Sequence, residues 1–158
     1  RDPEMSRGLG DVYKRQIWRF SMPGNTLFSI GEALIDMIPS KSGCAFAEVP
    51  AFAPRVGGAP ANVCGAFTKL GGASALLTQL GDDPFGHKIA DELAACGIDT
   101  AHIAFTDKAN TALAFVSLEA DGNRTFSFYR KPSADLLYAP EQVDPPCLTQ
   151  RLLCIFAA

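Results

Sequence analysis

Apolar and polar positions alternate along the chain in a pattern that predicts short strands separated by two amphipathic helices. The run over residues 26–38 is apolar and compatible with a strand, although Gly31 and Glu32 interrupt it and Asp36 lies near its end. Another apolar run, SALLTQL, covers residues 74–80. Short connections between such strands and the helices favour right-handed parallel crossovers. The pattern therefore predicts an α/β fold.

Two helices are marked by their first and last residues. The first begins with Pro60 in its opening turn and stops at the pair Gly71-Gly72. The second begins with Asp83 as N-cap, followed by Pro84, and ends before Gly97. Apolar residues recur at helical spacing in the first helix, at Val63, Phe67 and Leu70. In the second helix the expected buried stripe is Phe85, Ile89, Leu93 and Cys96.

Two further segments have the character of antiparallel strands. Residues 44–56 carry Pro50 and Pro54, which suits edge strands. Apolar and polar residues alternate over residues 111–130 on both sides of Asp121-Gly122-Asn123, and this pattern is typical of a β-hairpin. Because an isolated two-stranded ribbon is marginally stable, we expect both segments to form one small sheet over the carboxyl ends of the main strands.

Composition narrows the functional classes. The 158 residues, 47% of them apolar, suit one compact domain. Fourteen basic and 17 acidic residues give a net charge of −3 without charge runs, so we expect a small-molecule partner, no nucleic acid and no membrane. No apolar stretch reaches the roughly 18 residues of a membrane span. Five cysteines without a C-x-x-C pair favour a cytoplasmic protein with no structural metal.

The two ends of the chain do not read as parts of a domain. Residues 1–16 have no amphipathic period, and DVYKRQ resembles a translated, transposon-derived sequencing adaptor; a disordered natural tail is the alternative. We therefore expect residues 1–21 to be a non-native leader and residues 22–158 to be the N-terminal part of a domain. The apolar run over residues 152–158 is typical of a buried strand, which predicts truncation on the C-terminal side.

The stretch RVGGAPANVCGAFTKLGG places Gly57 and Gly58 directly before a helix. A phosphate loop needs G-x-x-x-x-G-K-[ST] and a dinucleotide site needs G-x-G-x-x-G, and the sequence contains neither. What remains is main chain that approaches a neutral ligand, with Asn62 in the first helical turn offering an amide that both donates and accepts. The alternative is a simple turn in which Asn62 hydrogen-bonds locally.

The sequence GGAPAN, with Gly71 and Gly81 at their observed spacing, resembles the N-terminal signature of the PfkB sugar kinases, the ribokinase-like family. Cys64 departs from the small residue that is usual there. GEALIDMIP resembles the family's first strand, GDDPFG its second helix start, and RTFSFYRKPSADLL the lid strand of the fructokinase branch. The resemblance implies a three-layer α/β/α fold with a small β-sheet lid, of which only the N-terminal half is present.

The resemblance also implies a sugar pocket. Asp36 would bind sugar hydroxyls from the end of the first strand, and Gly57, Gly58 and Asn62 would line the same pocket. Arg130, at the end of the lid strand, would face the ligand or the transferred phosphoryl group. A carboxylate that accepts hydrogen bonds from sugar hydroxyl groups discriminates against analogues that lack those hydroxyl groups. The alternative for Asp36 is a surface acid in a loop.

Other polar and aromatic residues are expected to be structural. Arg124, near the hairpin turn, suits a solvated face. Phe126 and Phe128 alternate with the strand and should cover core. His87 and His102 have no carboxylate or second histidine at a useful spacing.

The family places its catalytic base and anion hole in a Gly-Ala-Gly-Asp stretch, which this sequence lacks, so no catalytic residue is assigned. The implied parent uses ATP and Mg²⁺ to phosphorylate a sugar hydroxyl. The first candidate substrate is fructose, which would be converted to fructose 6-phosphate. This segment alone is expected to be inactive. Alternatives are a kinase for ribose or aminoimidazole riboside, or a non-catalytic sugar-binding or dimerising remnant. The lid of family members can also serve as a homodimer surface.

Overall fold

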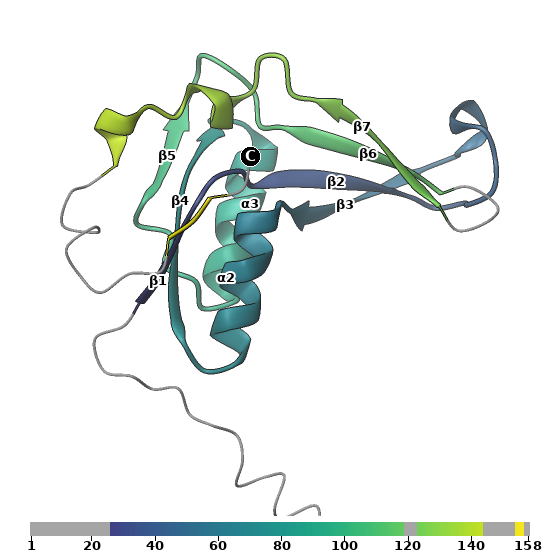
Figure 1. Ribbon diagram of the computed structural model, residues 1–158. Helices are drawn as coiled ribbons and strands as arrows, with labels where there is room; N and C mark the ends of the chain where they lie inside the picture. Colours follow the sequence, from purple (N-terminus) through teal and green to yellow (C-terminus); the bar gives the residue numbers. More distant parts are fainter. Residues whose placement is uncertain (1–25, 119–122, 144–153, 157–158) are drawn as a thin grey trace, which may run out of the picture.

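The computed structural model describes residues 26–118, 123–143 and 154–156. Its first sheet is parallel and has the strand order β5-β4-β1-β8. Figure 1 shows this sheet beside a second sheet that begins where β1 passes into β2. The four parallel strands are β1 (Thr26–Ile30), β4 (Ala73–Gly81), β5 (Ile103–Thr106) and β8 (Cys154–Phe156).

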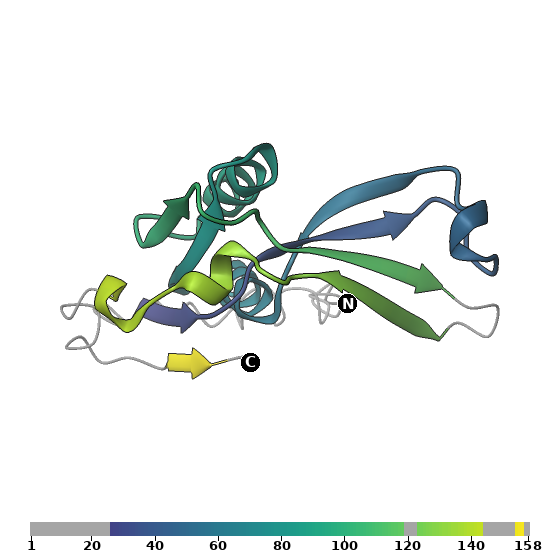
Figure 2. The ribbon, with the colours of Figure 1, turned by 90° about the horizontal axis from the view of Figure 1, so that it is seen from above.

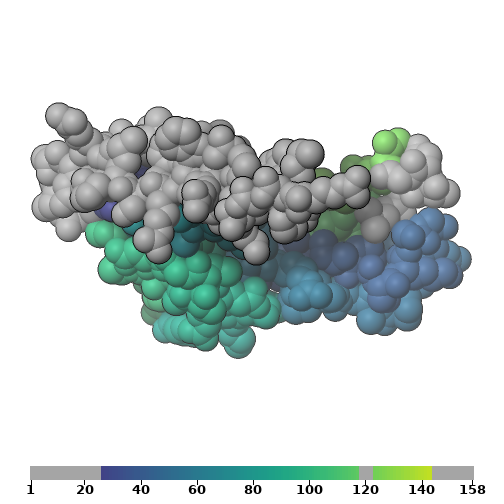
Figure 3. All heavy atoms as spheres, turned by 90° about the horizontal axis from the view of Figure 1, so that it is seen from below, coloured from purple at the N-terminus to yellow at the C-terminus, as the bar shows by residue number. Residues whose placement is uncertain are grey.

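The second sheet, here called the lid sheet, has the order β3-β2-β6-β7. Strands β2 and β6 pair in parallel, while β3 and β7 pair antiparallel to them on the two edges. In Figure 2 the lid sheet projects from the parallel sheet as an arm. In Figure 3 the blue residues, near 40–55, lie at one end of the molecule, away from the green residues near 90–100. The strands of the lid sheet are β2 (Leu34–Pro39), β3 (Phe52–Gly57), β6 (Leu113–Leu118) and β7 (Arg124–Tyr129).

Helices α2 (Ala59–Lys69) and α3 (Pro84–Ala95) lie on one face of the parallel sheet. Both sheets contribute to the core beneath them, because Ile35 of β2 packs in one buried cluster with Leu76 of β4 and Ile89 of α3. The opposite face of the parallel sheet carries a smaller cluster of Phe28, Ala75 and Leu77, against which Tyr138 and Val143 pack. Three short 3-10 helices complete the description: η1 (Phe46–Glu48), η2 (Ala134–Leu137) and η3 (Pro140–Gln142).

The apolar run over residues 26–38 forms two strands in two different sheets, where the sequence predicted one interrupted strand. Both pieces are apolar because both contribute to buried clusters. Asp36 consequently lies in the middle of β2 and not at the end of a strand of the main sheet. The predicted strand pair over residues 44–56 is likewise reduced to β3, because η1 occupies part of that segment.

The helix boundaries agree with the sequence signals, but the predicted burial of Cys96 was wrong, and the last apolar residue of the first helical pattern is not buried either. Leu70 and Cys96 are exposed, because α2 ends at Lys69 and α3 at Ala95, so the apolar periodicity continues past each helix. Asp83 caps α3 as predicted. The residues of α2 that are buried are Pro60, Ala61 and Cys64.

The prediction that Phe126 and Phe128 cover core was also wrong. Their side chains are 48% and 58% exposed, and their rings stack on each other with centroids 5.8 Å apart. The register explains this result: both residues lie on the face of β7 opposite Tyr129, and it is Tyr129 that contacts Phe115 in the aromatic cluster on the other face of the lid sheet.

Candidate functional site

Asp36 and Gly57 come together on the lid sheet. Strands β2 and β3 pair so that Leu34 is opposite Gly57 and Asp36 is opposite Arg55. The Asp36 carboxylate lies over Gly57, because a Cβ atom added to this glycine would overlap the Asp36 Oδ2 atom. The first glycine of the pair therefore leaves bare main chain beside a carboxylate.

Gly58 has a different role. Its φ of 102° lies in the region that side chains disfavour, and an added Cβ would be 2.5 Å from the Glu32 carbonyl oxygen. Gly58 is the N-cap of α2, so the close contact brings the start of this helix against the connection between β1 and β2. The packing at the start of α2 therefore explains why position 58 is a glycine, without any contact to a ligand.

Asp36 shares a small hollow with the exposed face of the lid sheet. The hollow has a volume of about 170 Å³ and is also lined by Ile38, Val116, Arg124 and Phe126. Burial raises the pKa of the Asp36 carboxyl, and the nearby negative charge of Glu32 raises it further. A carboxylate held in this way gains from hydrogen-bond donors that a ligand supplies, since they favour its charged form.

Arg130 directly follows β7, and two carboxylates hold its guanidinium. Nη1 lies 2.5 Å from Oε2 of Glu32, and Nε donates to Oδ2 of Asp135 over 2.8 Å, with Nη2 on the same oxygen. Ser133 Oγ donates to the other Asp135 oxygen over 2.5 Å. The side chains of Arg130, Glu32 and Asp135 are only 25%, 15% and 4% exposed. Sequence reasoning found Arg130 but missed both acidic partners.

Asn62 does not line the hollow of Asp36. It is exposed in the first turn of α2, where its backbone N–H donates to Gly58 over 3.0 Å. Its side chain lines a different hollow of about 420 Å³, which includes Lys69 of α2 and Cys96 beyond α3. The structure therefore brings together Asp36 and Gly57 and leaves Asn62 apart from them, while the guanidinium of Arg130 pairs with Glu32 and Asp135.

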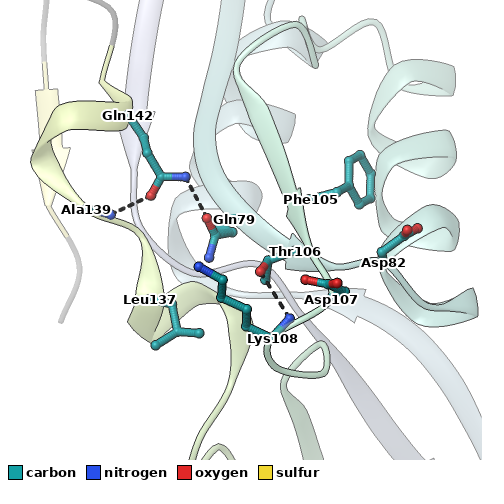
Figure 4. A pocket seen from close by; sticks show the side chains of 9 residues that line it. All are labelled: Gln79, Asp82, Phe105, Thr106, Asp107, Lys108, Leu137, Ala139 and Gln142. Atoms are coloured by element: carbon teal, nitrogen blue, oxygen red, sulfur yellow. Dashed lines mark hydrogen bonds between the residues drawn. The ribbon is translucent and has the colours of Figure 1, made fainter.

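A further hollow of about 740 Å³ lies at the carboxyl ends of β4 and β5 (Figure 4), and none of the residues predicted from the sequence lines it. Its buried polar residue, Gln79, donates to Ala134 O over 3.0 Å and accepts from Gln142 Nε2 over 2.7 Å. These bonds fasten η2 and η3 to the parallel sheet. A glutamine inside the apolar run of β4 was the only sequence signal of this hollow.

The segment GDDPFG is explained by packing. Oδ1 of Asp83 accepts hydrogen bonds from the backbone N–H groups of Phe85 and Gly86, and Oδ2 accepts one from Thr111. Gly81 and Gly86 leave room for these contacts, because an added Cβ on either would meet Asp83, Thr111 or the facing main chain. This segment ties β4, α3 and the start of the lid hairpin together.

Within the described residues there is no group of three or more His, Cys, Asp and Glu side chains arranged to hold a metal ion. The expectation that His87 has no carboxylate at a useful spacing was wrong, because its Nε2 lies 2.8 Å from Oδ1 of the exposed Asp82. Its ring also stacks on Phe105, and the ring of His102 lies near that of Phe28. In the same part of the chain, no helix is long and apolar enough to cross a membrane.

These features define an α/β domain with a β-sheet lid that presents a carboxylate beside bare main chain. Residues 25–155 match the model of the pfkB family carbohydrate kinases, and the chain belongs to this family.

Individual relatives agree with the assignment. A fructokinase from Solanum tuberosum is 49% identical over 124 residues, which are 78% of this chain and 39% of that protein. The crystal structure of fructokinase with bound ATP from Xylella fastidiosa is 43% identical, with a TM-score of 0.72 over 82% of this chain and 40% of that one. A putative ribokinase II from E. coli, in its apo form, is 31% identical with a TM-score of 0.75 over 82% of this chain and 41% of that one. The fold is therefore ribokinase-like, and the chain spans about two fifths of the length of these relatives.

Proposed function

We propose that the complete protein carrying this segment transfers a phosphoryl group from ATP to a sugar hydroxyl, converting fructose to fructose 6-phosphate. The observation that carries the proposal is the Asp36 carboxylate held over the bare main chain of Gly57, in a chain 49% identical to a fructokinase. A carboxylate can accept hydrogen bonds from two hydroxyl groups of one sugar. The segment thus supplies part of the sugar pocket and the lid.

The roles of the other predicted residues follow from their positions. Gly58 shapes the start of α2, so it acts on the pocket through the main chain. Asn62 is exposed and one turn further along, so we propose that its amide contacts the sugar after its side chain turns out of the α2–α3 hollow. Exchange of Asn62 for alanine should therefore weaken fructose binding without affecting the pKa of Asp36.

We propose ATP as the phosphoryl donor and Mg²⁺ as the ion that neutralises its phosphates. The relative from Xylella fastidiosa was solved with bound ATP, which supports the donor. Asp83 caps a helix and Asp135 pairs with Arg130, so neither carboxylate is free to hold Mg²⁺, and the described residues contain no group of three or more His, Cys, Asp and Glu side chains arranged to hold a metal ion. We therefore assign the metal and the catalytic base to residues outside those described.

We further propose that the protein is cytoplasmic and that the lid sheet forms a homodimer surface. The free cysteines Cys44, Cys64 and Cys96 are consistent with a reducing compartment. The exposed, stacked rings of Phe126 and Phe128 form an apolar surface on β7. Sedimentation of the complete protein would test the dimer, which exchange of both phenylalanines for serine should dissociate.

The proposed activity is tested by assaying the complete protein with ATP and with fructose, ribose or nucleosides at equal concentrations. We expect the highest kcat/KM with fructose and a large loss on exchange of Asp36 for alanine. Equal turnover of all substrates would overturn the choice of fructose. Unchanged affinity and turnover in the Asp36 variant would overturn the proposed pocket.

A further inference from the structure

One face of the lid sheet carries both the Asp36 carboxylate and an aromatic ring. In the register of this sheet, Asp36 of β2 lies opposite Ala114 of β6, and Ala114 lies opposite Phe128 of β7. Because side chains alternate along a strand, Phe126 lies on the same face as Phe128. Strand β6 separates β2 from β7, so the two outer strands are about 10 Å apart. The face therefore presents a carboxylate and, across one strand, an aromatic surface.

Apolar side chains line the space between Asp36 and Phe126. Both residues line the hollow of about 170 Å³, and Ile38 and Val116 contribute to the same lining. Val116 is directly opposite Phe126 in the register. Among the described residues, the polar part of the lining comes from Asp36 and Arg124. A ligand in this hollow would therefore meet a carboxylate and a guanidinium together with an apolar wall that offers it no hydrogen bond.

The ring of Phe126 has a surface available for a ligand. It stacks on Phe128 with an interplanar angle of 15°, which covers part of one ring face, and both side chains remain exposed. Phe128 lines a different hollow, of about 780 Å³, together with Tyr129 and Lys131. The two rings thus share a strand, a face and a stacking contact, but it is Phe126 that lies beside Asp36.

A sugar matches a wall of this kind because its two sides differ chemically. Its hydroxyl groups can donate to a carboxylate, whereas its C–H bonds present an apolar surface. The face of an aromatic ring is negative and attracts such hydrogens, and burying the apolar surface of both partners adds to the attraction. The hollow is smaller than the roughly 300 Å³ at which complete ligand pockets begin. It therefore holds one side of a sugar.

We propose that Phe126 is a specificity-determining residue of the sugar site: its ring packs on the C–H side of the sugar whose hydroxyl groups bind to Asp36. The inference rests on the proposed function, because it names a second contact in the same pocket. A sugar that turns a hydroxyl group toward the ring loses a hydrogen bond to water without gaining another, which weakens binding. Phe126 thus selects against ketohexoses that differ from fructose in the configuration of a carbon facing the ring.

The test compares Phe126→Ala with the matched control Phe128→Ala in the complete protein. Both changes remove one ring of the same stacked pair from an exposed strand, so effects on the stack and on the lid surface are shared. Calorimetric titration without ATP measures the affinity for fructose and for its epimers psicose, tagatose and sorbose. Steady-state assays give kcat and KM. Fluorine NMR of protein labelled with fluorophenylalanine follows the ring of Phe126 as sugar is added.

We expect Phe126→Ala to weaken fructose binding about tenfold, the effect of losing apolar contacts in a specific pocket, and to change KM more than kcat. Phe126→Tyr should restore the affinity because it keeps the ring. Phe128→Ala should bind fructose like the wild type. The wild type should bind at least one epimer more weakly than fructose, and Phe126→Ala should reduce that difference, because water then reaches the misplaced hydroxyl group. The fluorine signal of Phe126 should shift on binding.

The inference is overturned if Phe126→Ala and Phe128→Ala bind fructose equally well, or if the ranking and spread of the four ketohexoses are the same in Phe126→Ala as in the wild type. A Phe126 signal that does not respond to any sugar the protein binds also overturns it, whatever the substrate is. Failure of the proposed function has a different signature. If another sugar is turned over faster than fructose while the Phe126 signal still responds to it, the choice of fructose falls and the contact with Phe126 stands.

Discussion

Exchange of Asp83 for alanine should cost more stability than any other single loss of an acidic side chain at the start of α3. The carboxylate accepts hydrogen bonds from the N–H groups of Phe85 at 2.9 Å, Gly86 at 2.8 Å and Thr111 at 2.7 Å. Loss of an N-cap costs about 1 kcal/mol, and loss of a hydrogen bond to a charged acceptor about 1.5–3 kcal/mol. The two contributions lower the expected free energy of unfolding by about 3 kcal/mol.

The matched control is Asp82→Ala, because Asp82 is exposed and pairs only with the exposed His87 among the interactions seen here. Such a pair contributes at most about 1 kcal/mol. Urea unfolding of the complete protein at pH 7 measures both variants. Asp83→Asn should lose an intermediate amount of unfolding free energy, because the asparagine side-chain oxygen can still cap α3 while its amide group faces the N–H of Thr111. Equal losses for Asp82→Ala and Asp83→Ala would refute the reasoning.

The same comparison has a defined pH dependence. Burial alone would raise the pKa of Asp83, but the hydrogen bonds from Thr111, Gly86 and Phe85 together outweigh it and lower the pKa. A carboxyl with a lowered pKa stabilises the fold above its unfolded pKa, and the stabilisation is lost as the pH falls through the folded pKa. The difference between wild type and Asp83→Ala should therefore narrow in acid; a constant difference down to pH 2 would contradict this account.

Three further predictions concern the site and the core. Asp36→Asn should raise the free energy of unfolding at pH 7 and weaken fructose binding. Because its pKa is raised, Asp36 stabilises the fold only at low pH, and this contribution is lost as the pH rises through the folded pKa. Thermal unfolding measures the stability and fructose titration the affinity, and unchanged binding would contradict the proposed role. Gly57→Ala should raise KM for fructose by displacing the carboxylate with little loss of stability, whereas Gly58→Ala should cost about 1–3 kcal/mol of unfolding free energy through its backbone strain; the reverse order of effects would be evidence against the assigned roles. In native protein at pH 8, iodoacetamide should modify exposed Cys96 well before Cys64, whose thiol is buried and has its pKa raised by burial; equal rates by mass spectrometry would show that the core beneath α2 is open.

Local signals predicted the elements of this fold better than their assembly. The cap at Asp83 and the glycines after α2 were readable because caps and stops depend on a few adjacent residues. The division of residues 26–38 between two sheets was not, because both pieces are apolar and hydrophobicity does not say which sheet a strand joins. Cys96 was misplaced because a periodic pattern does not mark where a helix ends.

The residues of the candidate site were likewise predictable only where they belong to a local sequence pattern. GGAPAN and Asp36 could be found because they belong to short patterns that resemble a family signature. Glu32 and Asp135 could not, since their importance depends on both reaching Arg130, which is distant from Glu32 in the chain and close to it only after the lid sheet forms. Charge networks of this kind carry no local spacing, so only tertiary structure brings them into view.

Strand β2 explains why the position of Asp36 depends on the core. Ile35 is fully buried in the cluster beneath α2 and α3, and the next residue, Asp36, points to the opposite face of the lid sheet. Because side chains alternate along a strand, a shift of one residue would bury the carboxylate and expose the isoleucine. The unfavourable burial of an unpaired charge excludes that register. Core packing at Ile35 therefore fixes which face of the lid sheet carries the carboxylate, so variants at Ile35 should change fructose affinity as well as stability.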